Sequence, residues 1–223
     1  MSTQRTEAIV LRRTNYGEVD RIVQFITPNG KVSAIAKGVR KQKSKLAGGI
    51  ELLAISDITL HGGRGDLAVV TSARLVTFFD HILGDYDRLQ FAYVVLKDIA
   101  KASEQLDEPD FFDITHTALS SLNQTNISPN IVELWYRLRM STLLGVAVNL
   151  DRDDTGMQLV EDARYRFDPE SMTFVFDSRG EFTSSHIKLL RMASVGTPEV
   201  IAHIKGVGDL LGVCMSVGRI AHE

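Results

Sequence analysis

Six cationic side chains fall within fifteen residues early in this 223-residue chain. They are Lys31, Lys37, Arg40, Lys41, Lys43 and Lys45, and no acidic residue lies between Asp20 and Glu51. Cations at this density neutralise phosphates and release their counterions whatever the base sequence. The segment therefore predicts a sequence-independent site for nucleic acid. Its alternative interpretation is a solvated loop without a partner.

Four more side chains, three of them in candidate strands, extend this prediction. Arg12, Arg13 and Arg21 lengthen the expected phosphate track, and Tyr16 can stack on a base, which is how many proteins hold single strands. Structural alternatives remain open for two of them. Tyr16 can instead support the turn at residues 15–17, and Arg21 can be matched to the neighbouring Asp20.

The basic character is local. Residues 1–80 carry twelve Lys and Arg against seven Asp and Glu, a net of +5, whereas residues 81–223 have a net of −8. The whole chain is mildly acidic, with a formal net charge of −3. Charge is thus segregated along the sequence, with the cations in its first part.

Catalytic patterns are weak. The six histidines are scattered without a close-spaced metal pair, and no Gly-x-Ser-x-Gly nucleophile elbow occurs. Residues 62–66 (GGRGD) lack the Lys-Ser/Thr pair of a phosphate-binding loop, so we expect a hairpin turn there. We therefore predict a protein that is not an enzyme and needs no cofactor. The alternative is a hydrolase that uses scattered acidic residues.

Cysteine content and hydropathy indicate where in the cell the protein is expected. Cys214 is the only cysteine, which excludes an internal disulfide and a multi-cysteine metal site. No apolar stretch approaches the roughly 18 residues needed to cross a bilayer, and residues 1–5 lack the apolar core of a signal peptide. We expect a cytoplasmic protein that associates with the nucleoid through DNA.

The first eighty residues read as a small β-module. Predicted strands cover residues 7–13, 20–27, 31–36, 50–60 and 67–79. Pro28, Asn29 and Gly30 form a turn signal in which Asn-Gly supplies the positive-φ positions of a tight hairpin. Five short strands, with the longer connection between the third and fourth, favour an OB-type β-barrel.

From residue 85 the hydrophobic period changes to that of helices. The first predicted helix has an expected buried stripe formed by Tyr86, Leu89, Tyr93, Leu96 and Ala100. Pro109 opens a second helix, and Ser128 with Pro129 caps a third whose apolar residues we assign to the core, the alternative being a partner surface. The fold class is therefore α+β, a five-stranded barrel followed by a mainly helical domain.

A β-hairpin interrupts the helices at about residues 150–184, with strands at 165–168 and 173–177. Ser184 and Ser185 are expected to cap a further helix, and residues 198–220 supply one or two more. Gly206 and Gly208 resemble the glycine hairpin of helix-hairpin-helix modules, whose backbone N–H groups meet phosphates. The alternative is a plain turn between packed helices.

Four segments together resemble the bacterial RecO family of recombination mediators, in the family's order and spacing. They are residues 16–23 (YGEVDRIV), 27–40 (TPNGKVSAIAKGVR), 44–48 (SKLAG) and 63–67 (GRGDL). The match is specific across residues 7–80 and weaker to about residue 150. The resemblance implies an OB-fold DNA-binding domain at 1–80 and a helical domain at 81–223.

The resemblance also implies a function. RecO-like proteins bind single- and double-stranded DNA, anneal complementary strands, engage RecR and the C-terminal tail of the single-strand-binding protein SSB, and help to load RecA. An SSB-tail pocket is expected on the helical domain, with Arg137 and Arg139 as candidate cations. The alternative is a protein-interaction adaptor whose barrel binds a protein partner instead of DNA.

One departure from the family concerns metal. Many RecO relatives carry a four-cysteine zinc site in the helical domain, and those cysteine pairs are absent here. We therefore predict a zinc-free insert, held by hairpin pairing and by four aromatic side chains. These are Tyr165, Phe167, Phe174 and Phe176.

Overall fold

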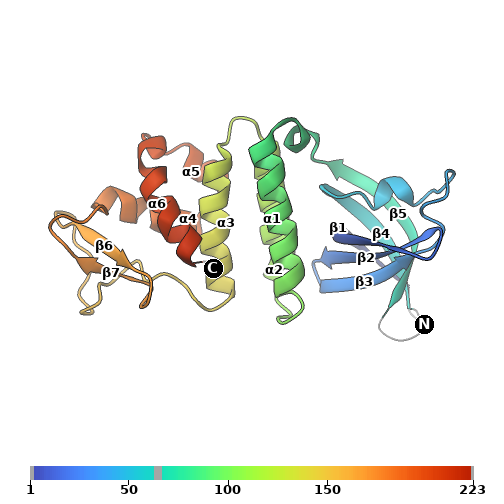
Figure 1. The fold of residues 1–223 in the computed structure, drawn as a ribbon, viewed down its shortest axis with the longest axis horizontal. Helices are drawn as coiled ribbons and strands as arrows, with labels where there is room; N and C mark the ends of the chain where they lie inside the picture. The colour runs from blue at the N-terminus through green and yellow to red at the C-terminus, as the bar shows by residue number, and fades with distance from the viewer. Residues whose placement is uncertain (1–2, 63–66, 222–223) are drawn as a thin grey trace. The chain divides into compact units, whose positions relative to one another are not determined.

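A computed structural model describes residues 3–62 and 67–221, so the turn predicted at 62–66 lies almost wholly outside the described residues. Contacts divide the chain into two compact units, Met1–Asn123 and Gln124–Glu223 (Figure 1). The first unit holds a β-barrel and two α-helices, and the second holds four α-helices and a hairpin, counted over the described residues. The contacts thus group two helices with the barrel, and a domain division at residue 80 stays a prediction.

Five strands close into the barrel, in the order β1-β2-β3-β5-β4. They are β1 (Thr3–Tyr16), β2 (Asp20–Thr27), β3 (Gly30–Ala36), β4 (Ala54–His61) and β5 (Ala68–Phe78). Neighbours pair antiparallel except β3 and β5, which are parallel and, among the described residues, share the pairs Ala34–Ala68 and Ile35–Val69. This confirms the predicted fold class, with a five-stranded OB-like barrel.

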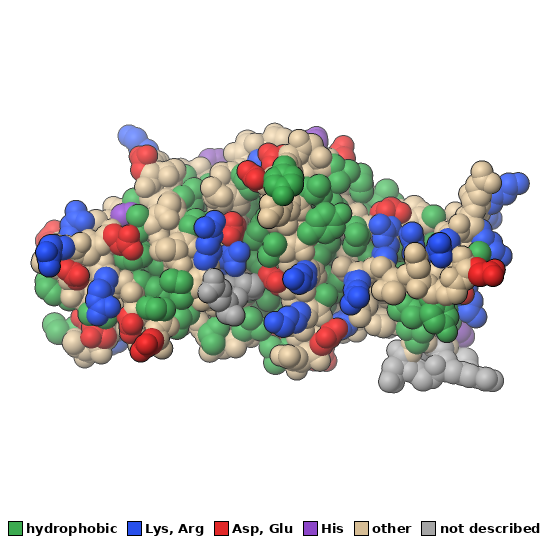
Figure 2. Space-filling model, in the orientation of Figure 1, with side chains coloured by type: hydrophobic (Ala, Val, Ile, Leu, Met, Phe, Trp, Pro, Cys, Tyr) green, Lys and Arg blue, Asp and Glu red, His purple; other side chains and the backbone are tan. Residues whose placement is uncertain are grey.

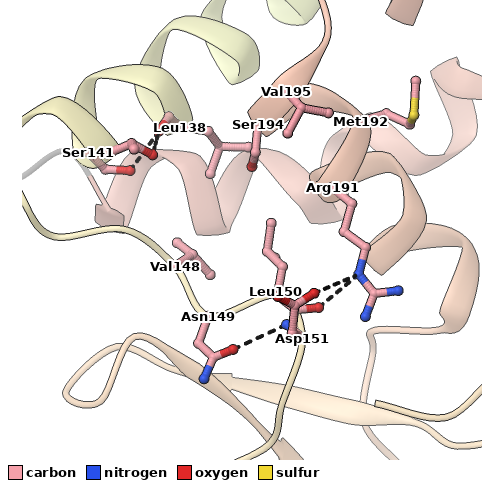
Figure 3. Close-up of a pocket in the computed structure, with 11 residues that line it drawn as sticks. Leu138, Ser141, Val148, Asn149, Leu150, Asp151, Arg191, Met192, Ser194 and Val195 are labelled. Carbon is pink, nitrogen blue, oxygen red and sulfur yellow. Dashed lines mark hydrogen bonds and ion pairs between the residues drawn. The ribbon is translucent and has the colours of Figure 1, made fainter. Parts of the chain in front are cut away.

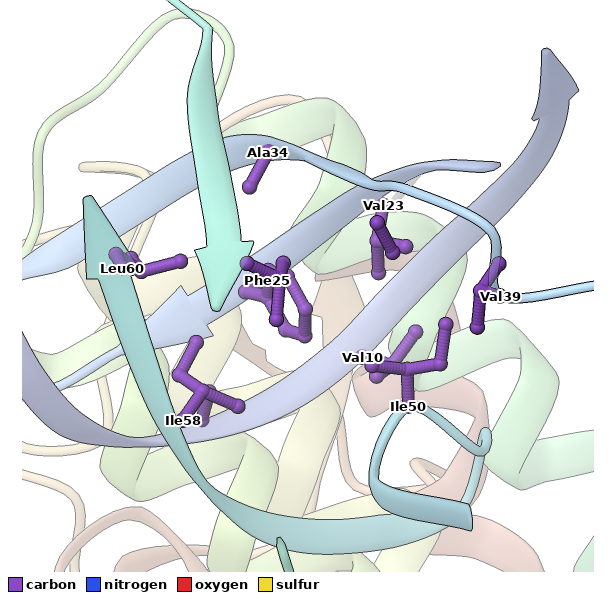
Figure 4. Packing of buried hydrophobic residues seen from close by; sticks show 11 residues of the cluster. Val10, Val23, Phe25, Ala34, Val39, Ile50, Ile58 and Leu60 are labelled. Carbon is purple, nitrogen blue, oxygen red and sulfur yellow. The ribbon is translucent and has the colours of Figure 1, made fainter. Parts of the chain in front are cut away.

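Alternating apolar side chains from the strands fill the barrel, among them Val10, Phe25 and Ile58 (Figure 4). The hairpin between β2 and β3 is also confirmed, with Thr27 paired to Gly30. Only Gly30 takes a positive φ, at +97°, whereas Asn29 does not. Gly30 is therefore the residue that the tight turn requires.

Two helices complete the first unit, α1 (Tyr86–Ala102) and α2 (Asp110–Asn123), and both contact β1. Two 3₁₀ turns also occur, η1 (Ala47–Gly49) before β4 and η2 (Asp80–Gly84) before α1. The predicted stripe on α1 is wrong at its two tyrosines, since Tyr86 is 77% exposed and Tyr93 is 47% exposed, whereas Leu96 is buried as predicted. Phe91, Val95 and Ile99 complete the buried face. Apolar residues occur on both phases of this segment, so spacing alone does not decide which face is buried.

The second unit is built around α3 (Pro129–Leu143), which packs against α4 (Ser184–Val195), α5 (Pro198–Ala202) and α6 (Val207–Ala221). The apolar side chains of α3 are mostly buried, as predicted for a core helix. The predicted cap of α4 is wrong by one residue, because Ser184 is already helical and Thr183 is the N-cap. The Thr183 backbone N–H donates to His186 Nδ1 at 3.1 Å.

The predicted hairpin consists of β6 (Tyr165–Asp168) and β7 (Thr173–Phe176). Tyr165 and Phe174 are buried as expected, but Phe176 is 63% exposed at the end of β7. Phe182, which was not predicted, is buried in the place expected for Phe176, with its ring centroid 5.2 Å from that of Phe174. Phe182 also forms a backbone bridge with Tyr165. The sequence did not predict this pairing, because Phe182 lies outside the predicted strands.

Candidate nucleic-acid interface

The basic loop, residues 37–53, joins β3 to β4 and is fixed to the barrel at both ends. Val39 near its start and Ile50 near its end are both buried in the barrel core. Figure 4 shows these two side chains pointing inward beside Val10. Burial of two apolar side chains offsets part of the entropy lost when the loop is ordered. The cations between them are thereby carried by an anchored backbone.

The start of the basic loop is also hydrogen-bonded to the turn between β1 and β2. The Gly38 N–H donates to Asp20 Oδ1 at 2.6 Å, and the Arg40 N–H donates to the Val19 carbonyl at 2.9 Å. Gly38 has φ of +63°, a conformation that glycine adopts without steric cost. Asp20 therefore positions the loop. It is not hydrogen-bonded to Arg21, whose Nε donates to Asn15 Oδ1 at 3.2 Å.

Short turns then present the cations to solvent. The Lys41 N–H donates to the Gly38 carbonyl at 3.1 Å, and the Ser44 N–H donates to the Lys41 carbonyl at 3.0 Å. The exposed cationic side chains are Lys37, Arg40, Lys41, Lys43 and Lys45. In Figure 2, Lys and Arg side chains gather over the barrel at the right of the view. Such a surface attracts a polyanion.

Tyr16 and Arg21 lie at the same end of the barrel as the basic loop. Arg21 pairs with Ala36, the last residue of β3, so it lies directly beside the start of the loop. Tyr16 is 54% exposed and pairs with Asp20 across the β1–β2 hairpin. The structure thus brings both side chains next to the cations with which the sequence grouped them.

Two other predicted contact residues have structural partners. Arg13 Nη1 lies 2.7 Å from Glu51 Oε2 and 3.3 Å from the Ile50 carbonyl, so Arg13 holds the end of the basic loop. Lys31 is at the opposite end of β3 from the loop, and its side chain is only 17% exposed. Its Nζ lies 3.4 Å from Glu104 Oε1. Lys31 is therefore not brought together with the other cations.

The second unit has a pocket of about 430 Å³ between α3, α4 and the segment before the hairpin (Figure 3). Leu138, Leu150 and Val195 supply apolar walls, and Arg191 lies at one side. Arg191 Nε donates to the Leu150 carbonyl at 2.8 Å. This contact spans 41 residues, so no local pattern could have singled out Arg191.

The two arginines predicted for partner binding do not line this pocket. Arg137 Nε lies 2.8 Å from Glu133 Oε1, an i,i+4 ion pair on α3. Arg139 Nη1 donates to the Ser194 carbonyl at 3.2 Å, which ties α3 to α4. Both side chains therefore have contacts that hold the second unit together.

The glycine hairpin joins α5 to α6. Gly206 has φ of +76°, which explains a glycine there without any ligand. Gly208 has no neighbouring atom within 4 Å of where a Cβ would stand, so close packing does not require it. Whether the two backbone N–H groups meet phosphates stays a prediction.

The first unit has the architecture of an OB-fold protein, with a closed five-stranded barrel that carries a cationic loop. Residues 1–79 match the family model described as Recombination protein O N terminal. The chain belongs to the RecO family, whose members are named as DNA repair proteins.

Three relatives named DNA repair protein RecO illustrate the match. The protein of Roseiflexus sp. (strain RS-1) is 31% identical over 166 residues, which cover 74% of this chain and 58% of the relative. That of Acetivibrio thermocellus is 30% identical over 151 residues, 66% of this chain and 59% of the relative. That of Heliobacterium modesticaldum is 34% identical over 152 residues, 67% and 54% respectively. The matched part thus spans somewhat more than half of each relative.

A four-cysteine zinc site does not fit this chain, which has one cysteine. Its one cysteine, Cys214, is buried in α6, and burial raises the pKa of the thiol to about 12. Within residues 3–62 and 67–221, no group of three or more His, Cys, Asp or Glu side chains could hold a metal ion. Aromatic packing of Tyr165, Phe174 and Phe182 occupies the hairpin region instead.

Among the helices of the described residues, none combines the length and apolar character needed to cross a bilayer.

Proposed function

We propose that this RecO-family chain is a recombination mediator that binds single- and double-stranded DNA on the basic loop and anneals complementary strands. The observation that carries the proposal is the anchored loop with its exposed cations. Lys and Arg side chains on such a loop screen the charge of the phosphate backbone and leave base edges free to pair. Annealing needs that combination, because two polyanionic strands repel each other until their charge is screened.

Membership of the RecO family supports the wider role that we propose. The chain helps to load RecA together with RecR on DNA coated by SSB, acts in the cytoplasm at the nucleoid, and is not an enzyme. Tyr16, Arg12 and Arg21 extend the DNA contact around the loop, whereas Arg13 and Lys31 act mainly through their ion pairs with Glu51 and Glu104.

A salt series tests DNA binding directly. Fluorescence anisotropy with a labelled single strand compares the wild type with a variant carrying Lys41→Glu, Lys43→Glu and Lys45→Glu. Loss of three phosphate contacts lowers the slope of log affinity against log salt by about two units. A variant with the same three lysines changed to Arg keeps the charge and the slope. An unchanged salt slope in the Glu variant would show that the basic loop is not part of the DNA interface.

The second-unit pocket is our candidate site for the SSB tail, in place of Arg137 and Arg139. Its apolar walls suit apolar side chains. Arg191 uses its Nε for the Leu150 carbonyl and for a 3.9 Å contact with Asp151 Oδ1, but its side chain is 41% exposed, and its two Nη groups suit an acidic chain end. A peptide that copies an SSB C-terminus should bind the wild type and lose affinity in Arg191→Ala, with Arg179→Ala as an exposed control. If Arg139→Ala lost peptide binding and Arg191→Ala did not, the SSB-tail site would instead lie at Arg137 and Arg139, as predicted from the sequence.

A second candidate function is an adaptor whose barrel binds a protein. The observation that favours it is a set of exposed apolar side chains on β5, Leu75, Val76 and Phe78. The adaptor function would replace the mediator function if the wild type failed to bind DNA even at low salt and still bound RecR through the exposed apolar side chains of β5.

A further inference from the structure

A second surface of the first unit has the chemistry to receive a nucleotide. It is a groove of about 470 Å³ between the barrel and α1, which we call the α1 groove. Leu11 of β1, Leu96 of α1 and Leu52 of the basic loop supply apolar lining. A flat aromatic base gains free energy when it leaves water for such a surface.

Cations from two separate elements border the α1 groove. Arg12 comes from β1, and Lys97 and Lys101 come from successive turns of α1, all three with exposed side chains. One carboxylate, Glu104, also lines the groove, but its Oε1 lies 3.4 Å from Lys31 Nζ. The lining therefore carries a net positive charge around an apolar floor, which complements a base attached to a phosphate.

Tyr93 adds an aromatic ring to this lining. Its side chain is 47% exposed although it stands midway along a packed helix, and it lines the groove. Stacking on an aromatic side chain is the usual way in which proteins hold an unpaired base, and every base offers a face for it. Tyr93 thus provides a planar ring for stacking, which the leucine side chains of the groove do not.

The α1 groove shares one residue with the basic loop. Leu52, near the end of that loop, lines the groove, and Arg13, next to Arg12 on β1, holds the same part of the loop through Ile50 and Glu51. The groove and the loop cations thus belong to one compact unit of the chain. An exposed aromatic ring among cations favours nucleic acid over an acidic peptide, because the ring can stack on a base.

We propose that the α1 groove binds an unstacked base and its phosphate, so that the chain distinguishes single-stranded DNA from duplex. The inference rests on the proposed DNA-binding function and adds a strand preference to it. Bases of a duplex are already stacked and paired, so they cannot enter the groove. Duplex is held by the loop cations alone, whereas a single strand uses the loop and the groove together.

The test compares two labelled probes, a mixed-sequence single strand and the duplex of the same length, by fluorescence anisotropy. Tyr93→Ala should weaken single-strand binding by about tenfold, the effect of removing one stacked base, and duplex binding by less than about twofold. Tyr93→Phe keeps the ring and should restore the affinity. Tyr86→Ala, the same change at an exposed tyrosine at the start of α1, is the matched control and should leave both affinities unchanged.

A charge variant separates the groove from the loop. Lys97→Gln with Lys101→Gln should lower the salt slope for the single strand by about one unit and leave that for the duplex unchanged. An equal loss of salt slope on both probes, or no loss on either, would overturn the proposal that the α1 groove binds an unstacked base. So would wild-type capture of an acidic apolar peptide that Tyr93→Ala abolishes without effect on DNA. Failure of the wild type to bind either probe would instead overturn the proposed function itself.

Discussion

At the scale of single residues, one carboxylate orients the cationic surface. Asp20 accepts a 2.6 Å hydrogen bond from Gly38, at the first turn of the basic loop. Sequence inspection assigned Asp20 only as a possible match for its neighbour Arg21. The bond joins residues 18 positions apart, so no local pattern could show it. The cations were predictable because they form a run, whereas the group that fixes them was not.

Two substitutions at this position have opposite expected effects. Asp20→Ala removes the acceptor, frees the loop and should weaken DNA binding several-fold, although it makes the chain more positive. Asp20→Asn makes the same change in charge and keeps an acceptor oxygen, so DNA binding should be equal or tighter. Anisotropy on both variants measures this. Tighter binding by Asp20→Ala would mean that charge alone, and not loop anchoring, governs affinity.

At the scale of elements, the strands were predictable from alternation and turn residues, and four helices from their period and caps. The full buried face of α1 was not predictable, because apolar residues lie on both sides of that helix and its packing against α2, η2 and β1 selects among them. The α1 groove was missed for the same reason. Tyr93 was assigned to the core, and the structure places it at the border of a groove.

The start of α4 makes a pH-dependent contribution to stability. Burial lowers the pKa of His186, whose Nδ1 accepts from the Thr183 N–H when the ring is neutral. Below the ordinary histidine pKa of about 6.5, the unfolded chain takes up a proton that the folded chain resists, so stability falls as pH falls. Melting temperatures on both sides of that pH should show a smaller acid-induced drop in His186→Gln. Equal drops would assign the acid sensitivity to other groups.

Gly49 allows η1 to lie directly on β5. A Cβ added there would stand 2.4 Å from the carbonyl carbon and oxygen of Ala73, whereas one added at Gly48 would meet nothing within 4 Å. Gly49→Ala should therefore destabilise the fold by about 1–3 kcal/mol through overpacking. Gly48→Ala is the matched control and should change stability little. Chemical denaturation measures both, and equal effects would contradict this close approach.

At the scale of the whole molecule, helices α1 and α2 belong with the barrel. Helix α1 packs on β1 and α2 of the first unit, so a barrel without α1 exposes the apolar surface that this helix covers. We expect residues 1–123 to fold alone and to bind DNA, and residues 1–80 to be unstable or to aggregate. Circular dichroism and anisotropy on the two fragments check this. A stable fragment 1–80 with full affinity would support the division predicted from sequence.

The way the barrel closes has a thermodynamic consequence. Within the described residues, the parallel seam between β3 and β5 contains two residue pairs, and the 3₁₀ turn in the second half of the basic loop packs on β5 at Ala73. The basic loop thus both carries the cationic surface and packs against the barrel. Any ligand that binds only the ordered loop must shift the folding equilibrium by mass action. Occupancy of the loop and the melting temperature of the barrel are therefore linked quantities, and either can report on the other.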